Sequence, residues 1–291
     1  MSANKIKKYQ TLLKYCQTQT QRDYINALIE TPNHKKVAKG FGVSERSVGY
    51  ALAQVKKHAG RLSDTNTKIV GIIGDTHLPY ELDGYISWLQ GVFKRERVDY
   101  VVHIGDLFDH HALSFHDSEP ALKGAYGEYI DALKHLQPWK DAFPQMTIIS
   151  GNHDKIPARQ MSKLGINPSR WMRPLSDVYE FPPGWCEVEE IVIDGVMYHH
   201  GHTAMGVNGF RNDAKNRMQN CVSGHAHGNL GVSWTSSHHR AVWGMAVGCG
   251  IDNNKMAFAY GRHFKHKPMV GCGVVKYGKY PMPFAMDLGE A

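Results

Sequence analysis

Acidic, imidazole and amide side chains recur along the chain in short patterns whose residue types could bind metal ions. Five such patterns occur, at 75–77 (Asp-Thr-His), 105–109 (Gly-Asp-Leu-Phe-Asp), 151–154 (Gly-Asn-His-Asp), 199–201 (His-His-Gly) and 224–227 (Gly-His-Ala-His). Histidine is abundant, with 18 residues in a chain of 291, which asks for an explanation by metal binding or proton transfer. Imidazole and carboxylate are ligands that manganese, iron, nickel and zinc accept. The patterns therefore predict a site for divalent metal ions.

Each pattern alone is weak evidence, since Gly-Asp turns are common, but five in order are a strong indication. Two divalent cations about 3.5–4 Å apart repel each other, so a metal pair needs at least one anionic ligand that both share. An Asp-x-His or His-x-His pattern at the end of a strand can aim both side chains at one point. The set as a whole therefore favours a two-metal centre.

The elements that must position these side chains are strands, because each pattern follows an apolar run rich in β-forming residues. The expected strands lie within 68–77, 98–109, 146–154, 196–202 and 220–227, and helical stretches lie at 86–97 and 122–137. Strand–helix alternation in the first half and strand-rich sequence in the second predict an α/β core with a partly mixed sheet. Loops at the carboxyl ends of strands are where such sheets assemble their sites. His103 lies inside one of these apolar runs, which favours a hydrogen-bonded core histidine over a ligand.

The ordered patterns resemble those of the calcineurin-like metallophosphoesterase superfamily. The resemblance implies a four-layer αββα sandwich over residues 69–291 and a cofactor of two divalent metal ions, with Mn²⁺ favoured and Fe, Ni or Zn compatible. It assigns Asp75, His77 and His227 to the first metal and makes Asp106 the bridge. The second metal takes Asn152, His200 and His225, where His200 is chosen because it stands immediately before Gly201.

The same resemblance implies a reaction, which is the hydrolysis of a phosphate ester by a metal-activated hydroxide. His153 is then the acid that protonates the leaving oxygen, and Asp109 orients His153 and stabilises its charged form.

The chain departs from the protein-phosphatase branch of that family at one position. There an arginine follows the second aspartate of Gly-Asp-x-x-Asp and grips the phosphate, whereas this chain has His110. A histidine offers no bidentate fork, so the departure argues against a phosphoprotein substrate. His110 remains a candidate phosphate contact. Arg159 is either a substitute cation for the phosphate or a structural ion-pair residue.

Charge divides the chain into a basic segment and a nearly neutral remainder. Residues 1–68 hold 13 Lys and Arg against four Asp and Glu. This positive excess is larger than the net charge of +7 that the whole chain carries. Such a segment suggests an electrostatic partner, although a solvated basic face would have the same composition.

The pattern inside the segment predicts two helices joined by a tight turn. The first runs from about His34 to Gly40 and buries Val37, Ala38 and Phe41; Ser44 then caps a second helix whose buried stripe is Val48, Leu52 and Val55. The spacing of Ala38, Gly42 and Val48 resembles a helix-turn-helix, which implies DNA as the partner, a helical docking or oligomerisation domain being the alternative. The expected DNA-facing residues are Arg46, Ser47, Tyr50, Gln54, Lys56 and Lys57.

The leading interpretation is thus a DNA-directed phosphodiesterase, with a DNA-binding domain at 1–61, a linker at 62–68 and a catalytic domain at 69–291. The alternatives are a phosphatase or phosphodiesterase for nucleotides or phosphoproteins, and a non-enzymatic DNA-binding regulator. No apolar run of 18 residues and no secretory signal are present, and the five cysteines are widely spaced. These features predict a reduced, cytoplasmic protein with no membrane partner.

Overall fold

The computed structural model divides the chain into two compact units, residues 1–66 and 67–291. The division falls inside the expected linker. The structure describes residues 6, 9–10, 12–13, 16, 18–62, 68–114, 122–201, 206–252, 254–255 and 267–288, without the side chains of residues 56–62. Within these residues, no helix is long and apolar enough to cross a membrane.

Three helices make up most of the described part of the first unit, α2 (Gln19–Glu30), α3 (His34–Phe41) and α4 (Glu45–Leu62). Each begins at a side chain that accepts a backbone N–H, as isolated helix starts require. Thr18 accepts from Gln21, Asn33 from Lys36 and, as the sequence predicts, Ser44 from Ser47. Gly42 ends α3 with φ +65°, a conformation that glycine adopts without strain.

The buried stripe of α4 forms the core of this unit together with α2 and α3. Val48, Leu52 and Val55 are at most 4 % exposed, as expected, and pack with Val37 and Ala38. Phe41 was expected in this core, but its side chain is 45 % exposed. Phe41 is the last residue of α3, and its ring makes an edge contact with the ring of Tyr24.

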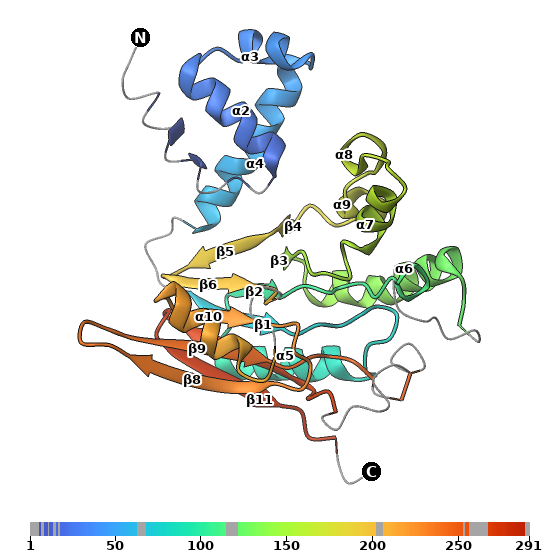
Figure 1. Ribbon diagram of the computed structural model, residues 1–291, viewed down its shortest axis with the longest axis vertical. Helices are drawn as coiled ribbons and strands as arrows, with labels where there is room; N and C mark the ends of the chain where they lie inside the picture. The colour runs from blue at the N-terminus through green and yellow to red at the C-terminus, as the bar shows by residue number, and fades with distance from the viewer. Residues whose placement is uncertain are drawn as a thin grey trace. The chain divides into compact units, whose positions relative to one another are not determined.

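The second unit contains two sheets (Figure 1). The first has the strand order β11-β10-β1-β2-β3-β4. Its strands β1 to β4 are parallel, whereas β10 and β11 are antiparallel additions at one side. The bounds are β1 Ile69–Ile73, β2 Tyr100–His103, β3 Met146–Ile149, β4 Trp185–Val188, β10 Gly271–Lys276 and β11 Tyr280–Ala285.

The second sheet has the order β5-β6-β7-β9-β8, in which β6, β7 and β9 are parallel and the two outer strands are antiparallel. The mixture of directions agrees with the partly mixed sheet expected from the sequence. The bounds are β5 Glu190–Ile193, β6 Val196–His199, β7 Cys221–Ser223, β8 Leu230–Ser236 and β9 Ala241–Val247.

The two sheets pack face to face between two helical layers, which confirms the αββα sandwich. Strand β1 is buried on both faces, as its unbroken apolar sequence requires. Gly71 faces the ring of Phe93 in α5 (Tyr85–Glu96), whereas Ile72 lies with Gly273, Met245 and Val247 between the sheets. Helix α6 (Ala125–Ala142) adds Leu136 and Trp139 to the α5 side, and α10 (Gly209–Arg217) packs on the outer face of β9.

The remaining helices join these layers. They are the 3₁₀ turn η2 (His111–Leu113) and, between β3 and β4, the short helices α7 (Ile156–Lys163), α8 (Pro168–Trp171) and α9 (Leu175–Val178). The sequence predicted α5 within one residue. It ended α6 too early, because α6 continues through Pro138 to a last turn anchored by the buried Trp139.

Candidate metal centre

The loops at the carboxyl ends of β1, β2, β3, β6 and β7 bring the expected ligands together. Three groups of donor side chains form among the described residues, and within each group the donor atoms lie within 4.8 Å of one another. Two of the groups consist of expected ligands, and the third is His77, Asp109 and His153. The first group is Asp75, His77, Asp106 and His227, and the second is Asp106, His200 and His225. Asp106 belongs to both groups, which is the place expected of a bridging carboxylate.

Asn152 joins the second group through its side-chain oxygen. Asn152 Oδ1 lies 2.9 Å from Nε2 of His200, and that same nitrogen is 3.2 Å from Asp106 Oδ2. The structure therefore gathers all seven residues that the resemblance assigned to metals, from five loops that lie between residues 75 and 227.

Glycines make room for the carboxylates. A Cβ atom on Gly151 would lie 2.0 Å from Oδ1 of Asp106, and one on Gly224 would lie 2.3 Å from Oδ1 of Asp75. Neither distance is sterically allowed, so any side chain at either position would displace a donor. The glycines of Gly-Asn-His-Asp and Gly-His-x-His thus have a packing role toward carboxylates of other loops.

Three of the donors lie in the left-handed region of backbone conformation. His77, Asp106 and His225 have φ values of +50°, +49° and +65°. Each such residue costs roughly 1–3 kcal/mol and persists only where the surrounding structure enforces it. Strain of this kind concentrates at functional sites, and here it falls on residues from three separate loops.

Hydrogen bonds fix the orientation of two candidate ligand imidazoles. Nδ1 of His77 donates to Asp109 Oδ1 at 2.7 Å, and Nδ1 of His200 donates to the carbonyl of Ile104 at 3.1 Å. In both rings this leaves Nε2 facing the centre with its lone pair available. Such outer partners are what a metal-binding imidazole requires.

The neighbouring His199 points the other way. Successive residues of a strand alternate between its faces, and Nε2 of His199 lies 2.7 Å from Oδ2 of Asp213 in α10. Of the two adjacent histidines, the structure thus brings His200 to the donor groups. His202, the other neighbour, lies outside the described residues.

The donor set fits two divalent cations. Asp75 is fully buried, and its Oδ1 has no hydrogen-bond partner among the described residues, a costly state for a carboxylate oxygen. Burial alone would raise the pKa of Asp106, but the nearby imidazoles of His200, His153 and His77 hold that pKa well below its usual range. Two buried carboxylates facing four imidazoles are a ligand set for metals of the Mn, Fe or Zn type.

His153 lies beside this centre with its ring held by Asp109. Its Nδ1 donates to the Asp109 carbonyl at 2.7 Å and lies 3.2 Å from Oδ1 of the same residue. Its backbone N–H donates to Asp106 Oδ1 at 2.8 Å. Burial lowers the pKa of His153, but the carboxylates of Asp109 and Asp106 outweigh it and raise the pKa to about 10. The two carboxylates therefore favour the protonated form of the ring.

Asp109 has a second partner that the sequence did not indicate, because its Oδ1 also accepts from His77. One carboxylate thus orients both a candidate ligand and the candidate acid. Asp154, the last residue of Gly-Asn-His-Asp, was likewise given no role; its carboxylate accepts from the N–H groups of Gly151 and Phe108 and ties two site loops together.

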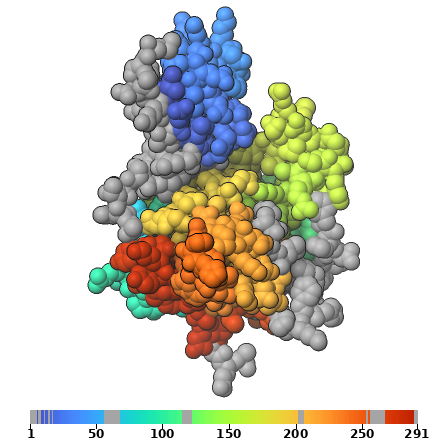
Figure 2. Space-filling view, turned by 60° about the vertical axis from the view of Figure 1, so that its left-hand side comes forward, coloured from blue at the N-terminus to red at the C-terminus, as the bar shows by residue number. Residues whose placement is uncertain are grey.

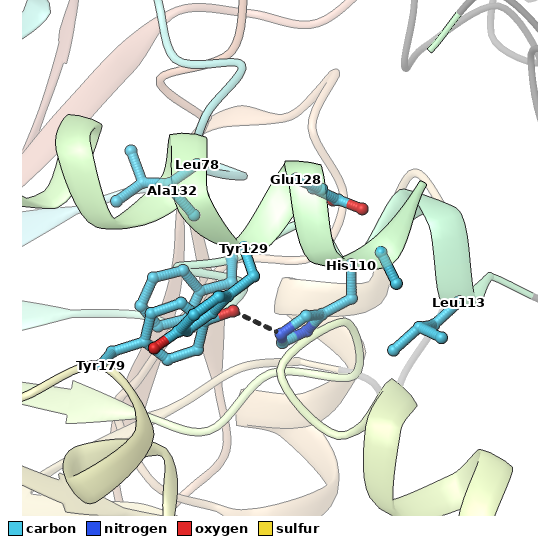
Figure 3. Close-up of a pocket in the computed structure, with 9 residues that line it drawn as sticks. Leu78, His110, Leu113, Glu128, Tyr129, Ala132 and Tyr179 are labelled. Atoms are coloured by element: carbon cyan, nitrogen blue, oxygen red, sulfur yellow. Dashed lines mark hydrogen bonds between the residues drawn. The ribbon is translucent and has the colours of Figure 1, made fainter. Parts of the chain in front are cut away.

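His110 does not occupy the position expected of a phosphate contact. Its side chain is buried, Nδ1 donates to the carbonyl of His153 at 2.9 Å, and Nε2 accepts from the hydroxyl of Tyr179 at 3.0 Å. Both ring nitrogens are therefore engaged, as Figure 3 shows for the Tyr179 side. His110 is a support for the His153 loop, and no local sequence signal pointed to Tyr179, 69 positions away.

The other predicted residues lie as follows. Arg159 is on the exposed side of α7. His103 is buried, accepts from the Gly105 N–H at Nδ1 and donates from Nε2 to Thr76, as a core histidine should. In α4, Arg46, Ser47 and Tyr50 are exposed and Gln54 is half-buried. The side chains of Lys56 and Lys57 lie outside the described residues.

Comparison with known proteins gives one family and several solved structures. The family model described as calcineurin-like phosphoesterase matches residues 69–246. No curated protein matches. Among solved structures, a single-mutant Vps29 from Entamoeba histolytica is 11 % identical, with TM-score 0.34 over 75 % of this chain and 99 % of that one.

Two further solved structures are similar at the same level. The phosphoesterase YfcE from E. coli is 13 % identical, with TM-score 0.36 over 72 % of this chain and 88 % of its own. The nuclease MPE from Pseudomonas putida is also 13 % identical, with TM-score 0.34 over 74 % and 87 %. Likenesses this distant say nothing about the substrate of this chain, so the family assignment rests on the family model.

Proposed function

We propose that the substrate of this chain is DNA and that the chain cleaves a phosphodiester bond. The premise is that the chain belongs to the calcineurin-like phosphoesterase family and is therefore a hydrolase acting on ester bonds. The observation that carries the chemistry is the sharing of Asp106 by two donor groups. Two divalent cations bound there would lower the pKa of a water molecule and neutralise charge on a phosphate.

The residues of the chain supply the rest of the reaction. His153 is held beside the donor groups, and the Asp109 carboxylate favours its protonated form, so it can donate a proton to the oxygen that leaves phosphorus. Asp109 keeps the ring in place through Nδ1, which leaves Nε2 as the donor. The arrangement supports hydrolysis of esters with a poor leaving group, such as the 3′ or 5′ oxygen of a sugar.

DNA as the substrate is supported by the first unit. Its α4 exposes Arg46, Ser47 and Tyr50 on the side opposite its buried stripe, and its sequence is strongly basic. A helix that follows a tight turn and presents such a face suits a major groove. The engaged nitrogens of His110 add to the argument against a phosphoprotein, because His110 stands where that branch has its arginine and both its ring nitrogens are bound within the protein.

The test is a substrate panel for the Mn²⁺-loaded protein, containing single- and double-stranded DNA, cyclic nucleotides, a phosphopeptide, p-nitrophenyl phosphate and bis(p-nitrophenyl) phosphate. We expect cleavage of DNA and of the chromogenic diester. Asp106→Asn should abolish both, because it removes the shared anionic ligand. Turnover confined to monoesters, or unchanged DNA cleavage by Asp106→Asn, would contradict the proposal.

A further inference from the structure

The connection between β3 and β4 has exposed side chains whose types need an explanation. These parallel neighbours need a crossover, and the chain uses three short helices for it, α7, α8 and α9, over residues 156–178. Figure 2 shows this segment, in yellow-green, as a projection from the second unit. It is called the crossover segment below. Many of its side chains are exposed, and neither the fold nor the donor groups account for their types.

The charge of the crossover segment is one-sided. Residues 155–178 contain five cationic side chains against one acidic side chain, Asp177, and the five are Lys155, Arg159, Lys163, Arg170 and Arg173. Lys155 pairs with Glu189. Arg170 and Arg173 are exposed and form no ion pair with any residue that the structure describes. A surface of this kind attracts an anionic partner.

Large apolar side chains are exposed among these cations. Trp171 is 78 % exposed, Leu164 is 77 % exposed and Ile166 is 38 % exposed. Single exposed apolar residues are ordinary, but three within eight positions suggest a surface that binds something. Trp171 stands directly after Arg170 and two residues before Arg173. An aromatic ring between two cations is the combination that binds single-stranded nucleic acid, by base stacking and phosphate contacts.

The crossover segment is fastened to the candidate site at both ends. At its start, the Ile156 N–H donates to the carbonyl of His153 at 3.0 Å. At its end, the Tyr179 hydroxyl donates to His110, and the Tyr179 ring stacks on Phe108 with centroids 3.6 Å apart. These contacts are with the loop that carries His153 and with the loop that carries its partner Asp109, and Figure 3 shows the bond between Tyr179 and His110. The segment that carries the exposed cations and Trp171 is therefore anchored at both ends to loops of the candidate site.

We infer that the crossover segment binds the single-stranded part of a DNA substrate beside the metal centre, with Trp171 stacked on an unpaired base and Arg170 and Arg173 against phosphates. The inference rests on the proposed function and makes it more specific. A duplex is the weaker fit, because its bases are stacked on each other and present no free face to Trp171. The substrate class is thus DNA with at least one unpaired strand near the scissile bond.

Kinetics with the full-length, Mn²⁺-loaded protein test the inference. The substrates are a 20-nucleotide oligo(dT) and, for the reaction centre alone, bis(p-nitrophenyl) phosphate. Trp171→Ala should raise the KM for oligo(dT) about 5- to 150-fold, the range expected for the loss of one stacked base. Turnover of the chromogenic diester should stay unchanged. Arg170→Ala/Arg173→Ala should raise the same KM and reduce its salt dependence, by about 1.4 in the slope of log KM against log salt.

Two matched controls separate this surface from general effects. Tyr280→Ala removes an aromatic ring that is 59 % exposed on β11, at the opposite edge of the first sheet from β4. Arg211→Ala/Lys215→Ala removes two exposed cations from α10, on the second sheet. Both should leave the KM for oligo(dT) within twofold of the unchanged protein. Equal effects of the crossover and control variants would overturn the inference.

The inference and the proposed function can fail separately. If the unchanged protein hydrolyses only small esters, the proposed function fails, and fluorescence anisotropy of labelled oligo(dT) with EDTA present then decides the inference. Weaker binding by Trp171→Ala than by Tyr280→Ala would support it, and equal binding would overturn it. A change of molar mass in light scattering on Trp171→Ala, with unchanged oligo(dT) binding, would show a contact between two copies of the chain and would also overturn it.

Discussion

Asp109 is the residue at which binding and proton transfer meet. Its carboxylate holds the ring of His77, a candidate ligand, and lies within reach of His153, the candidate acid. Substitutions at the two histidines should have different effects on metal binding. A change at His77 alters the donor set, whereas a change at His153 leaves every donor of both groups in place.

His153→Ala is therefore expected to retain metal and lose rate. The loss should be about 10²- to 10⁴-fold for DNA, the usual contribution of a general acid, and much smaller for bis(p-nitrophenyl) phosphate, whose leaving group needs no proton. The measurements are metal content by atomic emission and kcat for the two substrates. Equal losses on both substrates would remove His153 from the role of acid.

Gly151→Ala tests the packing of the centre without touching a donor. The new Cβ would collide with Asp106 Oδ1, so we expect weaker metal binding and a lower melting temperature of the second unit. Gly91→Ala is the matched control, since a Cβ on Gly91 in α5 meets nothing within 4 Å. That variant should gain about 0.4–1 kcal/mol, as an alanine does in place of a helical glycine. Metal titration followed by calorimetry compares the two.

The residue patterns foretold which side chains meet, because each pattern is short and each lies at the end of an apolar strand. They made His110 a candidate phosphate contact and gave no sign of its bonds to Tyr179 and His153, because neither those bonds nor burial is visible locally. They also left Asp154 without a role, although its place in Gly-Asn-His-Asp was known. Local sequence patterns therefore predict which side chains come together, but they do not predict the hydrogen bonds between residues far apart in the sequence.

At the scale of elements, Glu128 connects α6 to the loop that carries the site. Its carboxylate accepts from the N–H groups of His111 and Ala112, at 2.7 and 2.9 Å, although the side chain is nearly fully buried. Burial raises the pKa of Glu128 to about 7 from its usual 4.5, against the lowering effect of those two hydrogen bonds. The junction between α6 and η2 is therefore sensitive to pH.

The raised pKa of Glu128 sets the direction in which stability changes with pH. A carboxyl whose pKa is higher in the folded than in the unfolded protein adds stability that is fully present below about pH 4.5 and lost as the pH rises through about 7. Glu128→Gln cannot ionise, so its free energy of unfolding should fall less between pH 5 and pH 8 than that of the unchanged protein. Urea unfolding at several pH values measures both slopes. Identical slopes would mean that Glu128 is ionised in both states.

Elements with a clear period were predicted and those without one were not. Strand β1 and helices α3 to α5 have continuous or regularly spaced apolar residues that match their burial. Helices α7, α8 and α9 are short and largely exposed, so they lack the apolar stripe by which a helix is recognised. The crossover segment was invisible to the sequence patterns for that reason.

For the whole molecule, the important fact is that each unit has a hydrophobic core of its own. Val48, Leu52 and Val55 belong to the first core, whereas Leu89, Phe93 and Trp139 belong to the second. The chain separates between Asn66 and Thr67. A substitution can therefore change the stability of one unit while the activity of the other unit is measured as a reference.

Leu52→Ala should destabilise only the first unit. Removing a fully packed leucine costs about 2–5 kcal/mol, so DNA binding should be lost on warming at a lower temperature than in the unchanged protein. Thermal inactivation of bis(p-nitrophenyl) phosphate hydrolysis should be unaffected. Tyr50→Ala is the counterpart, because Tyr50 is 66 % exposed; it should weaken DNA binding without shifting either transition. A common shift of both transitions would show that the units unfold together.

The attachment of the crossover segment at two points has a consequence for how this enzyme could be altered. The chain leaves the sheet after Ile149 and returns to it at Trp185. The two attachment points, at His153 and Tyr179, are made by residues that any replacement could keep. The stretch between them is then a cassette, exchangeable for another of similar length while strands, donors and acid stay as they are. Substrate preference and reaction chemistry would be separable properties of the chain, and a library confined to residues 157–178 would explore the first without risking the second.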